Sequence, residues 1–411
     1  MHYSNPTNLA VIACPGGEAF ANQVLSHLKN QYKNIFSKTV DEMSKRYSMP
    51  PEKVSEQINF INEITASGLI AHSNDLKLHT PRFKVSTRFT MFPNGELKTE
   101  IIESVRGKDV YIIQDVENHS PLKFNEGTLV KQLSINDHLM MVYVTIDAVK
   151  QAGAERITLV VPVYPYSRQH KKKGREGLTA SRIGMIIELL GVERIITLDI
   201  HSREIGNAFC NMRLENLHAS YQIIRTLSKI ISLDSEDLVV VAPDTGAVDR
   251  NKFYATALKK PLALIYKERD YSRVTKDAMD NNIAEIKLLG NVKDKTVFMA
   301  DDMIGTGGTL LKAMQFLKEQ GAGKVICAVS LPFFSGNAIK YFDDAFAQGL
   351  FHRIIGTNAV YHDDLVKHEW YVSVNITKLF AQIISRLHQG ISITSILDNR
   401  DVIVKSLVTK V

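Results

Sequence analysis

The sequence has little cysteine and no long apolar run. Its 3 cysteines in 411 residues, Cys14, Cys210 and Cys327, lie far apart and form no CxxC pair. Such a set argues against a disulfide framework or a zinc site and fits a reducing compartment. No stretch approaches the roughly 20 apolar residues of a membrane span, and the N-terminus does not resemble a signal peptide. We therefore expect a soluble cytoplasmic protein with no membrane partner.

Two nucleotide-binding fingerprints are also absent. Neither the P-loop string GxxxxGK[ST] nor GxGxxG with a distant acid occurs, so a P-loop kinase and a Rossmann dehydrogenase are not supported. The net charge of +6 is modest and permits an anionic small-molecule substrate. Basic residues are spread out without an aromatic stacking set, so we expect no nucleic-acid partner.

Short apolar runs rich in β-branched residues alternate with helical segments along most of the chain. Most runs are continuously apolar, which is typical of parallel strands buried on both faces. Helical patterns over 137–153 and 309–321 each end in glycine, the usual helix-stop residue. This alternation predicts an α/β fold with strands at 9–13, 110–114, 157–163, 195–200, 238–243, 262–266, 296–300, 325–330 and 353–357.

So many strands exceed what one small sheet usually holds, so we expect two tandem α/β domains with mainly parallel central sheets flanked by helices. The predicted N-terminal domain covers 1–217 and the C-terminal domain covers 218–378. A C-terminal helix and tail over 379–411 is expected to pack back on the N-terminal domain.

The segment over about 30–82 differs from the alternating part of the chain. Pro50 and Pro51 stand near a helix start, and Gly68 marks a stop. Apolar residues lie between them at helical spacing, namely Val54, Ile58, Ile61 and Ile64. We interpret the segment as a folded helical insertion that serves packing or oligomer contacts, with no chemistry of its own.

A buried strand is expected to end in two adjacent acids, Asp301 and Asp302, and a glycine-rich loop follows before a helix. Ligands of open α/β sheets bind at the carboxyl ends of strands. Adjacent acids repel and are costly to bury unpaired, so they favour a partner such as hydroxyls or a cation. The loop Gly305–Thr309 offers backbone N–H groups and a helix N-terminus to an anion. A bare acid pair or a bare glycine turn would be an ordinary strand end, but the whole string favours a sugar-phosphate site.

The string ADDMIGTGGTL (300–310) resembles the phosphoribosyl-diphosphate signature of the type I phosphoribosyltransferase fold. Over about residues 85–395, the chain resembles the ribose-phosphate diphosphokinases, also called phosphoribosyl pyrophosphate synthetases. The stretches that carry this second resemblance are FPNGELKTEIIESVRGKDVYIIQ (92–114), VVPVYPYSRQHKK (160–172), RIITLDIHS (194–202), VAPDTGAVDR (241–250), LIYKER (264–269) and SGNAI (335–339).

The resemblance implies transfer of the diphosphoryl group of MgATP to the C1 hydroxyl of ribose 5-phosphate. The products are phosphoribosyl diphosphate, which feeds nucleotide biosynthesis, and AMP. By similarity, Lys267 and Arg269 stabilise the transferring group, at the start of a polar loop over about 270–286 that closes over the site. A bare KER after a strand is usually a surface feature, and only the ordered set of motifs favours the catalytic role.

The resemblance also assigns the ligands of the acceptor and of magnesium. Asp301 and Asp302 are expected to bind the ribose hydroxyls, and the 5-phosphate is expected on Thr306, Gly307, Gly308 and Thr309. The diphosphate loop is identified as Asp244, Thr245, Gly246 and Ala247, and Arg250 fits the same motif. His201 and Asp244 are the implied Mg²⁺ ligands. An isolated histidine is more often structural, and Mg²⁺ prefers oxygen, so the assignment of His201 depends on the family.

The ATP side of the site is implied in two other stretches. Phe92 is expected to stack on adenine, while Asn94 and Glu96 contact the purine edge. In the family these three residues come from a neighbouring subunit, so a homo-oligomer is implied, commonly a hexamer of dimers. Arg168 and Gln169 are expected to contact the nucleotide and its phosphates. The run of lysines at 171–173 would, as a bare string, be a solvated face.

The sequence departs from the family pattern at four points. Gly305 stands where the family generally carries a third aspartate, and His170 stands where it carries the aspartate of RQD. Ala247 replaces the second glycine of the diphosphate loop, where its methyl group is expected to crowd the backbone. The loop over 169–179 is one residue short.

None of these departures removes a proposed catalytic or ligand-binding residue, so we favour an active but divergent enzyme. Two alternatives stay open. One is a non-catalytic homologue that assembles with an active synthetase and regulates it, which Gly305 and the insertion favour. The other is a base-using phosphoribosyltransferase, which would not need the second domain or the FPNGE and YSRQH stretches.

Overall fold

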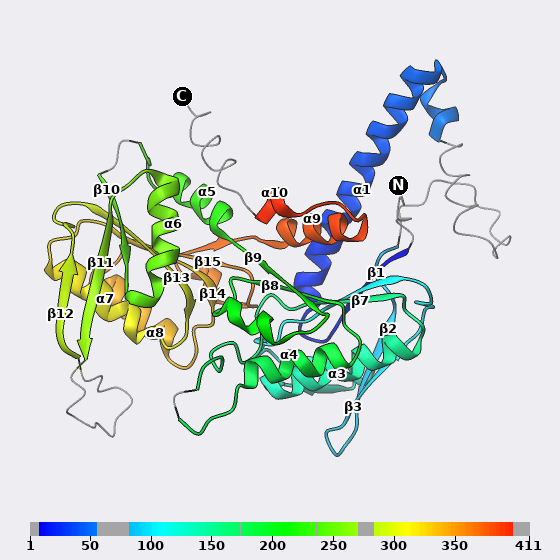
Figure 1. Ribbon diagram of the computed structural model, residues 1–411, viewed down its shortest axis with the longest axis horizontal. Helices are drawn as coiled ribbons and strands as arrows, with labels where there is room; N and C mark the ends of the chain where they lie inside the picture. The colour runs from blue at the N-terminus through cyan, green and yellow to red at the C-terminus, as the bar shows by residue number, and fades with distance from the viewer. Residues whose placement is uncertain (1–7, 56–81, 173, 235–236, 270–282, 398–411) are drawn as a thin grey trace. The chain divides into compact units, whose positions relative to one another are not determined.

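The computed structural model describes residues 8–55, 82–172, 174–234, 237–269 and 283–397 (Figure 1). The chain divides into two compact units. Unit 1 comprises Met1–Thr197, Ser202–Asn216 and Thr377–Ile396, and unit 2 comprises Leu198–His201, Leu217–Ile376 and Leu397–Val411. Each contains a mainly parallel sheet flanked by helices, which confirms the predicted α/β class. Within the described ranges, no helix is both long and apolar enough to cross a bilayer.

The sheet of unit 1 has the strand order β1-β4-β7-β8-β9. Its first four strands pair in parallel, and every residue of β1 and β4 is buried, as continuous apolar runs require. The strands are β1 (Leu9–Ala13), β4 (Asp109–Ile113), β7 (Arg156–Val160), β8 (Arg194–Leu198) and β9 (Arg213–Leu217). The helices of this unit are α1 (Glu18–Tyr47), α3 (Ile135–Gln151), α4 (Thr179–Leu189), α9 (Thr377–His388) and α10 (Thr394–Leu397).

Helix α9 comes from the far end of the sequence, yet it completes the core of unit 1. It packs on α1, where the rings of Phe20 and Phe380 meet edge to face with centroids 5.1 Å apart. Its last residue, His388, is buried and lies 2.9 Å through Nδ1 from Oδ2 of Asp109. Unit 1 is therefore assembled from both ends of the chain.

The predicted helical insertion is partly described. Its first part continues α1 without a break to Tyr47, and residues 51–55 are again helical. Val40 and Val54 are buried, whereas Tyr47 is exposed. The apolar positions from Ile58 onward and Gly68 lie outside the described residues.

Two small hairpins of unit 1 were not predicted. One pairs β2 (Thr87–Met91) with β3 (Leu97–Ile101), and the other pairs β5 (Leu122–Phe124) with β6 (Leu129–Lys131). These strands are short and half exposed, so they lack the continuous apolar runs by which the other strands were found.

The sheet of unit 2 has the order β12-β11-β10-β13-β14-β15-β16. Only the edge strand β12 is antiparallel to its neighbour. The strands are β10 (Leu238–Ala242), β11 (Leu262–Arg269), β12 (Ile283–Leu289), β13 (Thr296–Ile304), β14 (Val325–Pro332), β15 (Arg353–Thr357) and β16 (Tyr371–Val374). The flanking helices are α5 (Ser220–Ile230), α6 (Val248–Leu258), α7 (Gly308–Glu319) and α8 (Ala338–Ala347).

All the predicted strands are present, but some bounds differ, and two of the differences lie close to the predicted site. Strand β13 continues through the two acids to Ile304, because β14 also continues and offers pairing partners as far as Pro332. Asp301 and Asp302 therefore lie inside the last part of a strand and not after its end. The loop predicted over 270–286 does not extend to 286, because residues from Ile283 onward pair with β11; residues 270–282 lie outside the described residues.

Candidate functional site

The carboxyl edge of the sheet in unit 2 gathers most of the predicted acceptor residues. Strands β10 and β13 are parallel neighbours, so the segments that follow them emerge at the same edge. Asp244 comes directly after β10, while β13 carries the acid pair and leads into the loop 305–309. The predicted ribose, 5-phosphate and diphosphate residues thus lie in one unit at one edge.

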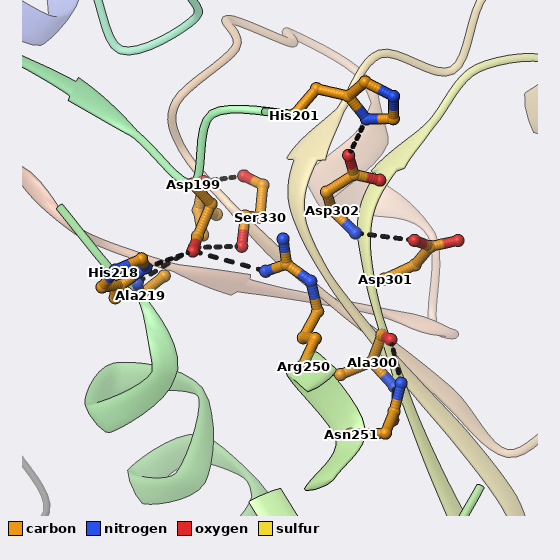
Figure 2. A network of polar contacts seen from close by, with 11 residues as sticks. Asp199, His201, His218, Ala219, Arg250, Asn251, Ala300, Asp301, Asp302 and Ser330 are labelled. Atoms are coloured by element: carbon orange, nitrogen blue, oxygen red, sulfur yellow. Dashed lines mark hydrogen bonds and ion pairs between the residues drawn. The ribbon is translucent and has the colours of Figure 1, made fainter. Parts of the chain in front are cut away.

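The two acids of β13 lie in different electrostatic surroundings. Oδ2 of Asp302 lies 2.6 Å from Nδ1 of His201, and Oδ1 of Asp301 accepts a hydrogen bond from the backbone N–H of Asp302 at 2.8 Å (Figure 2). Burial, and then the charge of Asp302, raise the pKa of Asp301 to about 7. Burial also acts on Asp302, but His201 and Arg250 outweigh it and lower the pKa of Asp302. The pair therefore suits a cation or several hydroxyl donors.

A buried ion pair that sequence analysis missed supports this edge. Asp199, just after β8, accepts from Ser330 Oγ at 2.5 Å and lies 2.7 Å from His218 and 3.3 Å from the guanidinium of Arg250 (Figure 2). Burial alone would raise the pKa of Asp199, but these partners, Arg250 first, hold it below its ordinary range. Arg250 is thereby fixed close enough for its charge to act on Asp302.

Asn251 joins the diphosphate loop to the strand that carries the acids. Its Nδ2 donates to the carbonyl oxygens of Ala247 and Ala300, both at 2.8 Å, and its Oδ1 accepts from the N–H of Ala300 at 2.9 Å. The side chain is fully buried. The only signal in the sequence was an asparagine at a position of α6 where the helical pattern leads one to expect an apolar residue.

The diphosphate loop forms a short 3-10 helix, η4 (Thr245–Ala247). Oδ1 of Asp244 accepts from the N–H of Ala247 at 3.0 Å and so fixes the turn, while Thr245 and Gly246 are exposed. Ala247 has a φ of −90° and is only 5% exposed. The methyl group that replaces the family's glycine therefore packs inward without backbone strain, and the expected crowding of the exposed side does not arise.

The loop for the 5-phosphate ends in a helix N-terminus without a side-chain cap. Gly307 precedes α7 with a φ of +80°, and no side chain hydrogen-bonds to the first turn. A Cβ at this position would lie 2.3 Å from Cε2 of Phe342, so only glycine fits. Thr306, Gly308 and Thr309 are exposed. The uncapped N–H groups of the first turn are the chemistry that binds an anion.

The predicted catalytic residues are described only through their backbone. Lys267 and Arg269 lie in the last part of β11, where they pair with Ile286 and Ile283 of β12. Strand β11 is the neighbour of β10, so their backbone follows the same sheet edge. Their side chains and residues 270–282 lie outside the described part of the structure.

The predicted ATP residues belong to unit 1. Phe92, Asn94 and Glu96 form the turn between β2 and β3, where the N–H of Phe92 donates to the carbonyl of Glu96 at 2.8 Å, and all three are exposed. Arg168 and Gln169 form an exposed turn after β7, in which the N–H of Gln169 donates to the carbonyl of Tyr166 at 2.8 Å. Both sets of predicted ATP residues thus belong to unit 1, whereas the acceptor residues belong to unit 2.

The types of residue at this edge agree with the implied magnesium ion. Within the described ranges no three His, Cys, Asp or Glu residues cluster as a ready-made metal site. Mg²⁺ takes few protein ligands and keeps water and phosphate oxygens, so a donor set as small as the predicted His201 and Asp244 is compatible with it. The charge of Asp302 contributes, after burial, to the raised pKa of Asp301, and a nearby cation would offset this charge. The residues therefore fit Mg²⁺.

Comparisons with known proteins agree with this geometry. Residues 10–191 match the family model "N-terminal domain of ribose phosphate pyrophosphokinase", and residues 212–365 match the phosphoribosyl transferase domain. Ribose-phosphate pyrophosphokinase A of Dictyostelium discoideum is 35% identical over 329 residues, which cover 80% of this chain and 93% of the relative. Ribose-phosphate pyrophosphokinase 2 of Schizosaccharomyces pombe is 34% identical over 308 residues, covering 74% of this chain and 86% of the relative.

A solved structure extends the similarity to the fold. The crystal structure of phosphoribosylpyrophosphate synthetase from Mycobacterium smegmatis matches with a TM-score of 0.66 and 25% sequence identity. The match covers 93% of this chain and 99% of that one.

Proposed function

This chain belongs to the ribose-phosphate pyrophosphokinase family, and from this membership we propose that it is an active diphosphotransferase. It transfers the diphosphoryl group of MgATP to the C1 hydroxyl of ribose 5-phosphate and so supplies phosphoribosyl diphosphate for nucleotide biosynthesis. The observation that carries the proposal is the pair of adjacent acids in β13 followed by the uncapped N-terminus of α7. One feature suits sugar hydroxyls or a cation, and the other suits a phosphate.

The acceptor is held by its two ends. The 5-phosphate binds the loop of Thr306, Gly307, Gly308 and Thr309, where backbone N–H groups and threonine hydroxyls donate to its oxygens. The ribose hydroxyls donate to the carboxylates of Asp301 and Asp302, which requires Asp301 to be ionised. The Asp199–Arg250 pair keeps positive charge behind the acids.

The transfer itself makes one bond and breaks one. The C1 hydroxyl oxygen attacks the β-phosphorus of ATP, the bond from that phosphorus to the α–β bridging oxygen breaks, and AMP leaves with this oxygen while the hydroxyl proton is released. Negative charge develops on the phosphoryl oxygens, which Lys267 and Arg269 stabilise. The loop of Asp244, Thr245, Gly246 and Ala247 receives the diphosphate through its exposed backbone.

Magnesium would be held by His201 and Asp244, with phosphate oxygens and water completing its shell. When bound, it supplies positive charge to the phosphate oxygens. Because Nδ1 of His201 contacts Asp302, a ligand bound through this nitrogen has to displace that contact.

The ATP base and phosphates are assigned to the exposed turns of unit 1. Phe92 stacks on the purine, Asn94 and Glu96 bind its polar edge, and Arg168 and Gln169 bind the phosphate chain. In the proposed homo-oligomer, the turn with Phe92 is contributed by a neighbouring copy. Light scattering that shows a monomer at working concentration would count against this shared site.

The decisive test is AMP formation by the purified protein from ATP and ribose 5-phosphate, with Mg²⁺ and phosphate present. We expect turnover by the wild type and a loss of about 10³-fold in kcat for Lys267→Ala, because one stabilising cation is removed. Lys340→Ala, on an exposed position of α8, is the matched control and should keep full activity. Absence of turnover in the wild type would favour the regulatory homologue, and full activity of Lys267→Ala would remove the catalytic assignment of Lys267.

A further inference from the structure

The hairpin β5–β6 is hydrogen-bonded to the strand that leads into the proposed purine-binding turn. Oδ1 of Asn125 accepts from the backbone N–H of Met91 at 2.9 Å, and Nδ2 of Asn125 donates to the carbonyl of Met91 at 3.0 Å. One side chain thus satisfies both backbone groups of the residue before Phe92. At this position the amide of Asn125 forms the hydrogen bonds that the backbone of a neighbouring strand would otherwise form with β2.

The backbone around Asn125 is shaped for this contact. Asn125, Glu126 and Gly127 all have positive φ, at 53°, 58° and 92°, a conformation that costs most residues energy and that asparagine tolerates better than most. The hydroxyl of Thr128 donates to the carbonyl of Asn125 at 2.7 Å. Phe124, which is 1% exposed, anchors the hairpin in the core. The buried ring of Phe124 therefore fixes the turn at 125–127 from which the Asn125 side chain reaches Met91.

The two strands of the β2–β3 hairpin are held by different elements. Strand β3 is fixed to α3, where the hydroxyls of Thr99 and Thr145 are hydrogen-bonded at 2.9 Å. Strand β2 receives the Asn125 contact, and its Arg88 also pairs with Glu126 through Nε at 2.9 Å. That ion pair is exposed and contributes little by itself. The hydrogen bonds of Asn125 are therefore the main polar contact between the β5–β6 hairpin and strand β2.

A hairpin of two strands is marginally stable alone, and its turn, residues 92–96, is exposed. We propose that Asn125 is a positioning residue that holds this turn in the geometry that accepts a purine nucleotide. The inference depends on the nucleotide role that the proposed function gives to Phe92. Asn125 itself does not touch the nucleotide and acts through Met91.

The test compares Asn125→Gly with Thr128→Ala. Glycine removes both side-chain hydrogen bonds but keeps the positive φ without strain, so it isolates the contact with Met91. Thr128→Ala removes one hydrogen bond from the same turn without touching β2, and is the matched control. We expect Asn125→Gly to raise KM for ATP about tenfold, the effect of losing two ordinary hydrogen bonds, with kcat and KM for ribose 5-phosphate within about twofold. We expect the control to leave all three unchanged.

A second readout does not depend on activity. Hydrogen–deuterium exchange over residues 90–96 should become faster in Asn125→Gly and stay unchanged in Thr128→Ala. Unchanged exchange in Asn125→Gly, or an unchanged KM for ATP while Phe92→Ala raises it, overturns the positioning role alone. An unchanged KM for ATP in Phe92→Ala overturns the nucleotide role of the turn, and the inference with it.

Discussion

The carboxyl edges of the two sheets hold polar residues of different character. At the edge in unit 1, the ring of His138 lies 2.8 Å from Nε2 of Gln114 on one side and 2.8 Å from the carbonyl of Asn118 on the other. The amide of Asn118 in turn donates to the carbonyl of Gly16 at 2.8 Å. Burial lowers the pKa of His138, so its imidazole is uncharged at neutral pH. The residues of this cluster hydrogen-bond to one another or to nearby backbone carbonyls.

At the edge in unit 2, two aspartates stand side by side. Burial, and after it the charge of Asp302, raise the pKa of Asp301. Ser134 and Asp137 form a capping box on α3 in unit 1, whereas α7 in unit 2 begins at Gly307 without a side-chain cap. An equivalent position in an α/β sheet is thus not enough to identify a site; the combination of two adjacent acids with an uncapped glycine loop distinguishes the edge in unit 2.

The largest expected effect comes from Asp302→Asn, which removes one of the two acids that distinguish the edge in unit 2 from the edge in unit 1. Loss of the carboxylate should lower kcat/KM by about 10³-fold, because the ribose and cation contacts are lost. The unfolding free energy of unit 2 should change by less than about 1 kcal/mol, because the amide keeps the shape and removes repulsion. Trp370, the single tryptophan of the chain and buried in unit 2, reports this unfolding by fluorescence. Activity within tenfold of wild type would contradict the assignment, with Asp249→Asn on an exposed position as the control.

The matching change in unit 1 is His138→Ala. It leaves two buried partners without their hydrogen bonds and opens a cavity, so the unfolding free energy should fall by about 2–4 kcal/mol. Where the variant is folded, kcat/KM should stay within about twofold of wild type. Circular dichroism during urea unfolding measures the first quantity and AMP formation the second. A tenfold loss of kcat/KM without loss of stability would mean that the edge in unit 1 also takes part in the reaction.

The smallest effect is a pH dependence that sharpens the contrast. Folding raises the pKa of Asp301 to about 7, so the folded state binds this proton more tightly than the unfolded chain. The resulting stability is present at low pH and is lost as the pH rises toward neutrality. Between pH 5 and pH 8, the urea midpoint of the wild type, followed by Trp370 fluorescence, should therefore fall relative to that of Asp301→Asn. Parallel midpoints across this range would show that folding does not raise the pKa of Asp301.

The sequence was sufficient for features that repeat locally. Continuous apolar runs located most of the parallel strands, but not β16, which spans only four residues. The ordered motifs located the acceptor edge, since motif and strand end fall together in this fold. It was not sufficient for features made by distant residues. Asp199, Arg250 and Ser330 meet only because three separate segments converge, and no spacing in the sequence marks their contact.

The two hairpins of unit 1 also could not be predicted from the sequence, for a different reason. Strand β2 is half exposed and β5 spans only three residues, so neither has a period long enough to detect. The extension of β13 through Asp301 was missed because polarity suggested a strand end, whereas the ladder with β14 decides where the strand stops. Backbone pairing overrides the polarity of the side chains here.

The contact of α9 with α1 has a consequence for synthesis. Phe20 leaves the ribosome early, whereas Phe380 follows only after residues 217–376 of unit 2 have been translated. At the usual rates of translation the interval is roughly tens of seconds. During that time the surface of α1 that packs on α9 lacks its native partner, although α1 can already pack on β1 and β4. Unit 1 therefore cannot complete its core until α9 has been synthesised, whereas residues 217–376 of unit 2 are available for folding earlier.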